Sequence, residues 1–346
     1  MPTPFSLEAT LTRAWLRRGP LACALLPVAA LFGALGAGRR LLYRRGLLAS
    51  AKLPVPVIVV GNIFIGGTGK TPLTIWLAAR LREAGYTPGI ISRGHGSAGA
   101  AMAPRAVTAG ALAREVGDEP LLMARRSGCP VVVGRDRPAA GRALLAQYPH
   151  VDILISDDGL QHYALQRDVE IVLFDGRGAG NGWLLPAGPL REPLGRRRDF
   201  TVVNGTSGGA RGLAGPLFFM RLAGTHAEQL IDRDRRLPLA ALASLSARVP
   251  VAAAGIGNPG RFFATVREAG LVVTELPLPD HHDFLDEPFA GLDADIILIT
   301  EKDAVKCGQI ENLKHDPRLW VVPVTAQLDA ALAEQIVEKC RGCSTA

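Results

Sequence analysis

Cysteine and aromatic residues are scarce in this chain. Its 346 residues include five cysteines, and aromatic side chains make up 5%. The cysteines lack the spacing of a disulfide framework, which favours a reducing compartment. Cys340 and Cys343 form a CxxC pair, but the sequence has no second pair or paired histidines near it. We therefore expect a solvated tail there, with a zinc or redox site as the alternative.

Acidic residues are nearly absent from the first 53 positions. This segment holds eight basic residues and one acid, Glu8, and the remaining 31 basic and 31 acidic residues cancel. The whole net charge of +7 therefore lies in one segment. A charge excess so confined does not suggest a nucleic-acid-binding surface, and we expect no nucleic acid among the partners.

The same segment contains an apolar stretch at residues 21–38, with Trp15 before it and Tyr43 after it. Basic flanks around an apolar stretch are typical of a membrane-surface helix. Its 18 residues would reach about 27 Å, slightly less than a hydrocarbon core of about 30 Å. We favour an interfacial helix, and a spanning helix, a core helix and a signal peptide remain alternatives.

The rest of the composition is that of a globular protein. Apolar residues make up 48% and charged residues 21%, which excludes a disordered chain, and the length suits two domains. Strand and helix patterns alternate, so we expect an α/β fold with a mostly parallel sheet covered by helices on both faces. The predicted strands are residues 55–60, 89–92, 131–133, 153–156, 170–174 and 201–203, and the helices are residues 72–84, 119–126 and 138–147.

Residues 57–71, VIVVGNIFIGGTGKT, run an apolar strand into a glycine-rich turn. Backbone N–H groups of such a turn can surround phosphates, while a lysine supplies a cation and a threonine a hydroxyl for Mg²⁺. The residues that match this role are Gly66, Gly67, Thr68, Gly69, Lys70 and Thr71. Phe64 replaces the first glycine of the common pattern G-x-x-x-x-G-K-[ST], so this is a variant nucleotide-binding loop, with a ligand-free turn as the alternative.

Two acids follow the apolar strand VDILIS at the point where it ends. Asp157 and Asp158 precede a glycine, and downstream of a phosphate loop such acids hold Mg²⁺. A simple Asp-Asp-Gly turn is the alternative. Because ligands bind beyond the carboxyl ends of parallel strands, we expect these carboxylates near the loop.

Three other segments carry candidate residues whose roles the sequence leaves open. Asp118 and Glu119 start a predicted helix, where Asp118 is either a functional acid or a helix cap. Arg93, and Arg191 with Glu192, either contact phosphate or lie in solvent. In the run Asp280-His281-His282-Asp283, a histidine beside carboxylates binds metal, transfers a proton or caps a helix.

The segment 255–260 fits the dinucleotide-binding pattern G-x-G-x-x-G between a strand at 251–254 and a helix at 261–269. Pro259 lacks the N–H that a pyrophosphate would require at this point. We therefore expect a tight turn that opens a second α/β unit, with further strands at 296–300 and 321–324.

Together these segments resemble the tetraacyldisaccharide 4'-kinases of lipid A synthesis. The matching segments, in order, are VGN…GGTGKTP at 60–72, SRG at 92–94, GDEP at 117–120, DDGLQH at 157–162, LPAGPLREP at 185–193, GIGNP at 255–259, DHHDF at 280–284 and TEKDAVK at 300–306. The resemblance covers nearly the whole chain, and His95 departs from it where the family usually has tyrosine. A membrane-associated switch ATPase with a similar loop, acting through a protein partner, is the alternative.

The resemblance implies transfer of the γ-phosphoryl group of ATP to the 4'-hydroxyl of an acylated glucosamine disaccharide 1-phosphate, at the cytoplasmic face of the bacterial inner membrane. By resemblance, Lys70 contacts the β and γ phosphates, and Thr71, Asp157 and Asp158 form the Mg²⁺ and phosphate site. Asp118 with His281 assists the attacking hydroxyl. Supporting roles fall to Arg93, Glu119 and Glu192. No obligate protein partner is expected.

The family fold implies two α/β units joined by a β-ribbon linker. We place a membrane-associated segment at residues 1–50, a phosphate-loop kinase domain at 51–214, the linker at 215–244 and a smaller α/β domain at 245–346. The active site is expected in the cleft between the two α/β units.

Overall fold

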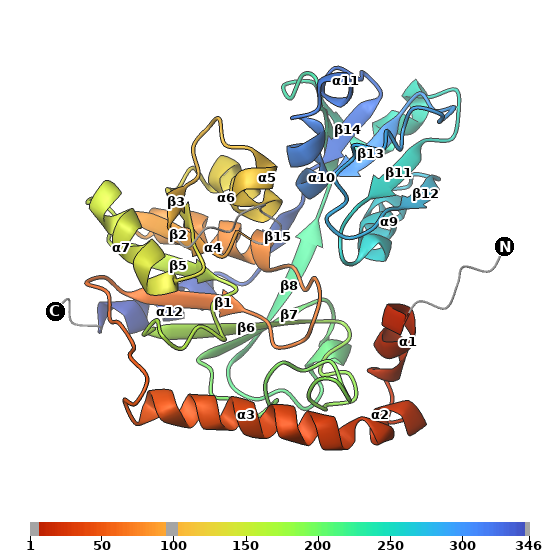
Figure 1. The fold of residues 1–346 in the computed structure, drawn as a ribbon. Coiled ribbons are helices and arrows are strands. Elements are labelled where there is room, and N and C mark those ends of the chain that lie inside the picture. Colours follow the sequence, from red (N-terminus) through yellow and green to blue (C-terminus); the bar gives the residue numbers. More distant parts are fainter. Residues whose placement is uncertain (1–6, 95–102, 343–346) are drawn as a thin grey trace.

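A computed structural model describes residues 7–94 and 103–342 of the chain, and of residues 7–9 only the backbone. It contains a nine-stranded and a six-stranded sheet, each with helices packed on it (Figure 1). This confirms the expected α/β architecture. His95 and Cys343, which the sequence singled out, lie outside the described residues.

The larger sheet is parallel except at its two edges, where β15 and β3 run antiparallel to their neighbours. In spatial order its strands are β15 (Thr325–Gln327), β8 (Leu217–Ala223), β7 (Phe200–Asn204), β6 (Val169–Asp175), β1 (Val57–Gly61), β5 (Ile153–Asp157), β2 (Pro88–Ser92), β4 (Val131–Val133) and β3 (Arg105–Ala106). Every residue of β1 and β5 is buried, as expected of strands covered on both faces. The six strands predicted for this sheet lie within two residues of their expected bounds.

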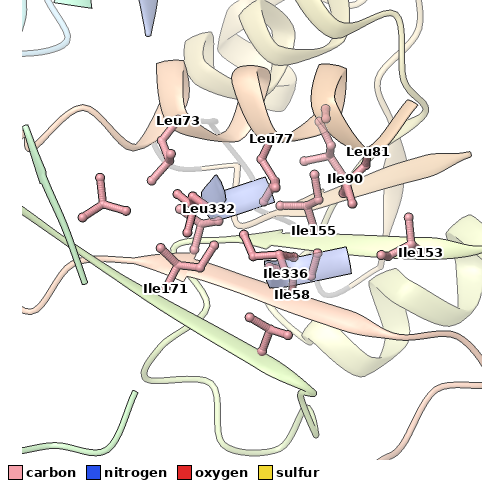
Figure 2. Close-up of a cluster of buried hydrophobic side chains, with 14 of the residues drawn as sticks. Ile58, Leu73, Leu77, Leu81, Ile90, Ile153, Ile155, Ile171, Leu332 and Ile336 are labelled. Atoms are coloured by element: carbon pink, nitrogen blue, oxygen red, sulfur yellow. The ribbon is translucent and has the colours of Figure 1, made fainter. Parts of the chain in front are cut away.

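Helices cover both faces of the larger sheet. The helices of this domain are α4 (Lys70–Glu83), α5 (Ala113–Val116), α6 (Asp118–Ser127), α7 (Arg137–Gln147) and α12 (Ala331–Arg341). Apolar side chains at spacings of four residues make one face of α4 hydrophobic. Figure 2 shows that α4 and α12 contribute to one core with the strands; its labelled residues are Ile58, Leu73, Leu77, Leu81, Ile90, Ile153, Ile155, Ile171, Leu332 and Ile336. Leu144 of α7 belongs to the core on the other face.

The smaller sheet forms a second unit with its own core. Its strands in spatial order are β10 (Arg236–Pro238), β9 (His226–Gln229), β14 (Leu319–Val322), β13 (Ile297–Thr300), β11 (Val251–Ala254) and β12 (Thr274–Pro277), and its helices are α8 (Leu239–Leu242), α9 (Pro259–Glu268), α10 (Glu301–Cys307) and α11 (Glu311–Lys314). Helix α9 begins two residues before its expected start because Pro259 occupies its first turn, a position that needs no N–H donor.

The expected domain ranges differ from the structure at two places. Strand β15 and helix α12 belong to the larger sheet, so the range 245–346 is wrong as a single C-terminal domain. The predicted linker range 215–244 contains β8 of the larger sheet together with β9 and β10 of the smaller one. The antiparallel pair of β8 and β15 connects the two units, and of these two strands only β8 lies in the predicted range. Local sequence does not reveal which of two sheets an apolar helix such as α12 covers.

The N-terminal segment forms α1 (Leu7–Ala14), α2 (Pro20–Ala24) and α3 (Leu26–Arg44), and α3 lies along the larger domain (Figure 1). The indole Nε1 of Trp15 donates to the carbonyl of Pro186 at 2.9 Å, and Nε of Arg18 donates to that of Asn181 at 3.1 Å. A Cβ at Gly33 would come within 2.8 Å of Leu184. Contacts of this kind attach the segment to the domain.

The outer side of this segment is apolar. Large hydrophobic side chains exposed here are Leu16, Leu21, Leu26, Val28, Leu31, Phe32, Leu35, Leu41, Leu42, Leu47 and Leu48. Within residues 7–94 and 103–342, no helix has the length and hydropathy needed to cross a bilayer.

The packing of α12 makes a testable prediction about the larger domain. Ile336 is fully buried in the core that α12 shares with α4, so Ile336→Ala should lower the free energy of unfolding by about 2–5 kcal/mol. Urea unfolding followed by circular dichroism measures this. Glu338→Ala, on the exposed side of the same helix, should have little effect. Equal midpoints for the two variants would contradict the placement of α12.

Candidate active site

The glycine-rich loop connects β1 to α4 at the carboxyl edge of the larger sheet. Gly66 and Gly69 both have φ near 100°, in the left-handed region that favours glycine. A Cβ at Gly69 would lie 2.5 Å from Nδ2 of Asn204, which no side chain could accommodate without displacement. Helix α4 begins at Lys70, so the loop ends at a helix N-terminus, where N–H groups point outward.

Two buried asparagines hold this loop in shape. Nδ2 of Asn62 donates to the carbonyls of Phe64 and Gly66, and Nδ2 of Asn204 donates to that of Thr68 at 2.9 Å. Sequence reasoning did not assign either asparagine a role. The sequence did contain a signal for them, because each asparagine follows a predicted apolar strand at its carboxyl end, where ligands bind in such sheets.

Lys70 lies between Asn62 and Asp158. Its Nζ donates to Oδ1 of Asn62 at 3.0 Å and lies 3.6 Å from Oδ1 of Asp158. The ammonium is therefore held over the loop by one neutral and one charged acceptor. The structure brings the predicted cation and one of the two predicted acids together.

Asp157 ends β5 and is buried. Ser92 donates a hydrogen bond to its Oδ2 at 3.1 Å, whereas its Oδ1 has no hydrogen-bond partner among the described residues. Burial first, and then the negative charge of Glu119, raise the pKa of this carboxyl above its ordinary value, against the effect of Lys70. A buried carboxylate oxygen left without a donor suits a hard cation, so the site fits Mg²⁺ with Thr71 as a hydroxyl ligand.

Asp158 has a different environment from its neighbour. Its φ of 49° turns its side chain toward Lys70 and Arg191, whose Nη1 is 3.5 Å from Oδ2. Burial opposes ionisation, but the positive charges of Lys70 and Arg191 outweigh it and lower the pKa of Asp158. The pKa values of these adjacent acids thus shift in opposite directions, because burial dominates at Asp157 and the neighbouring cations dominate at Asp158.

Arg137 was missed by sequence reasoning. It is 1% exposed, and its guanidinium donates to the carbonyl of Gly134 at 2.7 Å and to that of Asp157 at 3.0 Å. Burial lowers its pKa to about 10, and Asp157 and Asp158 oppose this effect. This buried arginine therefore holds the end of β5 in place. A single arginine at the start of a helix gives no sign in the sequence that it will be buried there.

Asp118 and His281 meet across the two domains. Oδ2 of Asp118 lies 3.1 Å from Nδ1 of His281, 3.7 Å from Nζ of Lys306 and 4.0 Å from Nζ of Lys302. The hydrogen bond to Asp118 is the main cause of a raised pKa for His281. For Asp118, burial favours the neutral form, but His281 and Lys302 outweigh it and lower its pKa. The expected pair is therefore present, and sequence reasoning missed both lysines.

The predicted supporting residues lie in three different places. Glu119 accepts a hydrogen bond from Lys302 at 3.0 Å and faces the phosphate loop. Glu192 is buried and accepts hydrogen bonds from Gln161 and Tyr163, so it shapes the segment after Asp158 rather than the phosphate loop itself. Arg93 is exposed at the end of β2.

His282, next to His281, has a local contact. Its Nδ1 accepts a hydrogen bond from the N–H of Phe284, and its Nε2 lies 3.3 Å from Asp286. An imidazole that accepts at Nδ1 carries its proton at Nε2 when neutral, which favours a bond to Asp286 over metal ligation. His282 therefore closes a local turn, a role that the sequence analysis did not name.

The phosphate loop faces a cavity of about 180 Å³ between the domains. Its walls include the phosphate loop and Glu119 of the first domain, together with Ile256, Arg261, Phe262 and Lys302 of the second. A second cavity, of about 350 Å³, is lined by Asp118, His281 and Lys306. The Lys302–Glu119 ion pair thus lies between the loop and the Asp118–His281 pair, in the expected cleft.

Comparison with known proteins identifies the family. The family model described as tetraacyldisaccharide-1-P 4'-kinase matches residues 21–341. A tetraacyldisaccharide 4'-kinase of Janthinobacterium sp. (strain Marseille) is 64% identical over 344 residues, which covers 99% of this chain and 98% of that protein. One of Herminiimonas arsenicoxydans is 61% identical over 351 residues, with the same two coverages.

A solved structure agrees with these sequence relatives. It is described as the "apo" form of LpxK from Aquifex aeolicus in complex with ATP, and it is 31% identical with a TM-score of 0.76. The match covers 92% of this chain and 99% of that one. The resemblance seen in the motifs is confirmed, and the chain belongs to the tetraacyldisaccharide 4'-kinase family.

Proposed function

We propose that this chain transfers the γ-phosphoryl group of ATP to the 4'-hydroxyl of an acylated glucosamine disaccharide 1-phosphate, using the residues described above. Its family is that of the lipid A 4'-kinases, and the switch ATPase alternative is not favoured. The observation that carries the residue assignment is the Lys302–Glu119 ion pair. Both residues line the cavity of the phosphate loop, and Lys302 also lies beside the Asp118–His281 pair. The phosphate loop, which binds the phosphoryl donor, and the Asp118–His281 pair, which acts on the acceptor hydroxyl, therefore line one cleft.

The donor side is built for a triphosphate with Mg²⁺. Backbone N–H groups of residues 66–71 surround the phosphates, and Lys70 adds a positive charge near the transferred group. Thr71 and Asp157 would hold Mg²⁺, with Asp158 beside them, and the cation would neutralise phosphate charge. Asp158 also holds Lys70 at the loop through its contact of 3.6 Å.

On the acceptor side, the Asp118–His281 pair removes one proton from the 4'-hydroxyl. When His281 is neutral, its Nδ1–H donates to Asp118, and its Nε2, which lies 3.4 Å from Nζ of Lys302, accepts the proton of the 4'-hydroxyl as the hydroxyl attacks phosphorus. Asp118 stabilises the imidazolium that results. Because phosphoryl transfer proceeds through a loose transition state, only a modest base is needed, and positioning contributes most.

The N-terminal segment supports placement at a membrane surface. Exposed leucines on α3 present an apolar face, and Arg44 and Arg45 lie exposed at its end. An amphipathic basic helix of this kind inserts its apolar side among lipid headgroups. An acylated substrate remains in the bilayer, so an enzyme bound there meets it without extraction. This reasoning favours the cytoplasmic face of the inner membrane, where ATP is available.

The kinase assignment is tested with labelled ATP, Mg²⁺ and the detergent-solubilised disaccharide 1-phosphate. Wild-type protein should place the label on the lipid. Lys70→Ala and Asp118→Ala should lower kcat about 100-fold or more, since each removes a group that acts on the transferred phosphoryl group or the proton. Glu338→Ala serves as the matched control with wild-type turnover. Label that stays off the lipid would refute the activity, and near-normal kcat would exclude the substituted residue from the mechanism.

The raised pKa of His281 predicts a pH dependence. Turnover should rise with pH through a pKa above the ordinary value of about 6.5, because the neutral imidazole is the base. Asp118→Asn removes the charge that raises this pKa, so the rise should move to lower pH as kcat falls. Rate profiles between pH 5.5 and 9 measure both effects, and an unshifted profile in Asp118→Asn would contradict the pairing.

Membrane binding is tested with vesicles that contain anionic lipid. Leu31 and Leu35 are 61% and 66% exposed, so Leu31→Asp with Leu35→Asp should release the protein from sedimenting vesicles, as should deletion of residues 1–50. Val272→Asp alters a still more exposed apolar residue, 79% exposed, on the second domain and should leave binding intact. Co-sedimentation of the double variant at the wild-type level would refute the membrane surface.

A further inference from the structure

The segment 255–260, whose glycine pattern first suggested a dinucleotide site, lies against the phosphate loop. A Cβ at Gly257 would come 3.4 Å from the backbone N of Gly67. A buried carboxylate holds this turn in place, because the N–H of Gly255 donates to Oδ2 of Asp303 at 3.0 Å. The second domain therefore places backbone directly over the loop that would hold phosphate.

Arg261 extends from this turn into the cavity. It stands in the first turns of α9 and lines the cavity together with the phosphate loop. Its nearest acid is Asp175 of the first domain, with Nη2 3.6 Å from Oδ2. That separation is longer than a charge-assisted hydrogen bond, so the guanidinium is only loosely held.

Asp175 is already fully engaged by another arginine. Arg177 donates to both of its carboxylate oxygens from Nε, and from Nη2 to Oδ2 at 2.7 Å. The guanidinium of Arg177 also lies 4.2 Å from the ring centroid of Phe64, which fixes its position. Asp175 itself is 1% exposed.

Two guanidinium groups thus share one carboxylate beside the phosphate loop. The pair of arginines carries one positive charge more than Asp175 balances, and the surplus lies with the weakly held Arg261. Burial lowers the pKa of Arg261, and Arg177 adds to this effect, while Asp175 opposes it. A partly buried, under-compensated cation in a nucleotide cavity favours an anionic ligand.

We propose that Arg261 is the second domain's contact to the triphosphate, and that on nucleotide binding its guanidinium moves from Asp175 to a phosphate oxygen. The inference rests on the proposed function, since it takes ATP as the ligand of the cavity. It gives Asp175 a definite task, which is to hold Arg261 at the cavity wall.

Equilibrium binding of a non-hydrolysable ATP analogue with Mg²⁺ tests the proposal without the lipid. Arg261→Ala should weaken binding about tenfold or more, the effect of losing one charge-assisted hydrogen bond. Arg261→Lys should recover part of the loss, because it restores charge without the planar fork. Arg267→Ala, an exposed arginine in the last turn of the same helix, is the matched control and should bind as wild type does.

The melting temperature of each nucleotide-free variant separates binding from folding. Wild-type affinity in Arg261→Ala would overturn the proposal. So would a loss of affinity that Arg261→Lys does not relieve and that follows a fall in melting temperature, because Arg261 would then act only as a structural partner of Asp175. Wild-type protein that binds the analogue but phosphorylates no lipid would refute the proposed reaction and leave the role of Arg261 standing.

Discussion

The fixed geometry of the phosphate loop at the end of β1 is the constraint on which the rest of the site depends. Glycines with positive φ expose backbone donors, and Asn62 and Asn204 bond the loop carbonyls so that the N–H groups remain directed outward. Lys70 is held by the same Asn62 that shapes the loop. Because one buried side chain fixes both backbone and cation, the charge pattern around the loop is set before any ligand arrives.

Around that loop, buried charge is distributed unevenly between two domains. Asp157 is buried and one of its oxygens has no donor among the described residues, while Asp158 lies beside Lys70 and Arg191. From the second domain come Lys302, Lys306 and His281, which all approach Asp118. The cleft therefore couples the position of the second domain to the chemistry at the first.

Much of this arrangement could be predicted from sequence, for specific reasons. Continuous apolar runs such as residues 153–156 predict buried parallel strands, and such strands place Asp157 and the loop at one edge. The pairing of Asp118 with His281 came from family resemblance, since their separation in sequence has no local signature. Arg137, Lys302 and Lys306 were missed because an isolated basic residue looks the same whether it is solvated or buried. The return of α12 to the larger sheet was missed because its apolar face fits either core.

The central claim is that the terminal phosphate of bound ATP lies between Lys70 and the Asp118–His281 pair. A crystal structure with a non-hydrolysable ATP analogue and Mg²⁺ tests this most directly. The account predicts phosphate oxygens on the backbone N–H groups of residues 66–71, Mg²⁺ on Thr71 and Asp157, and the γ-phosphate directed toward His281. A γ-phosphate that points away from His281, or a metal bound without Asp157, would contradict it.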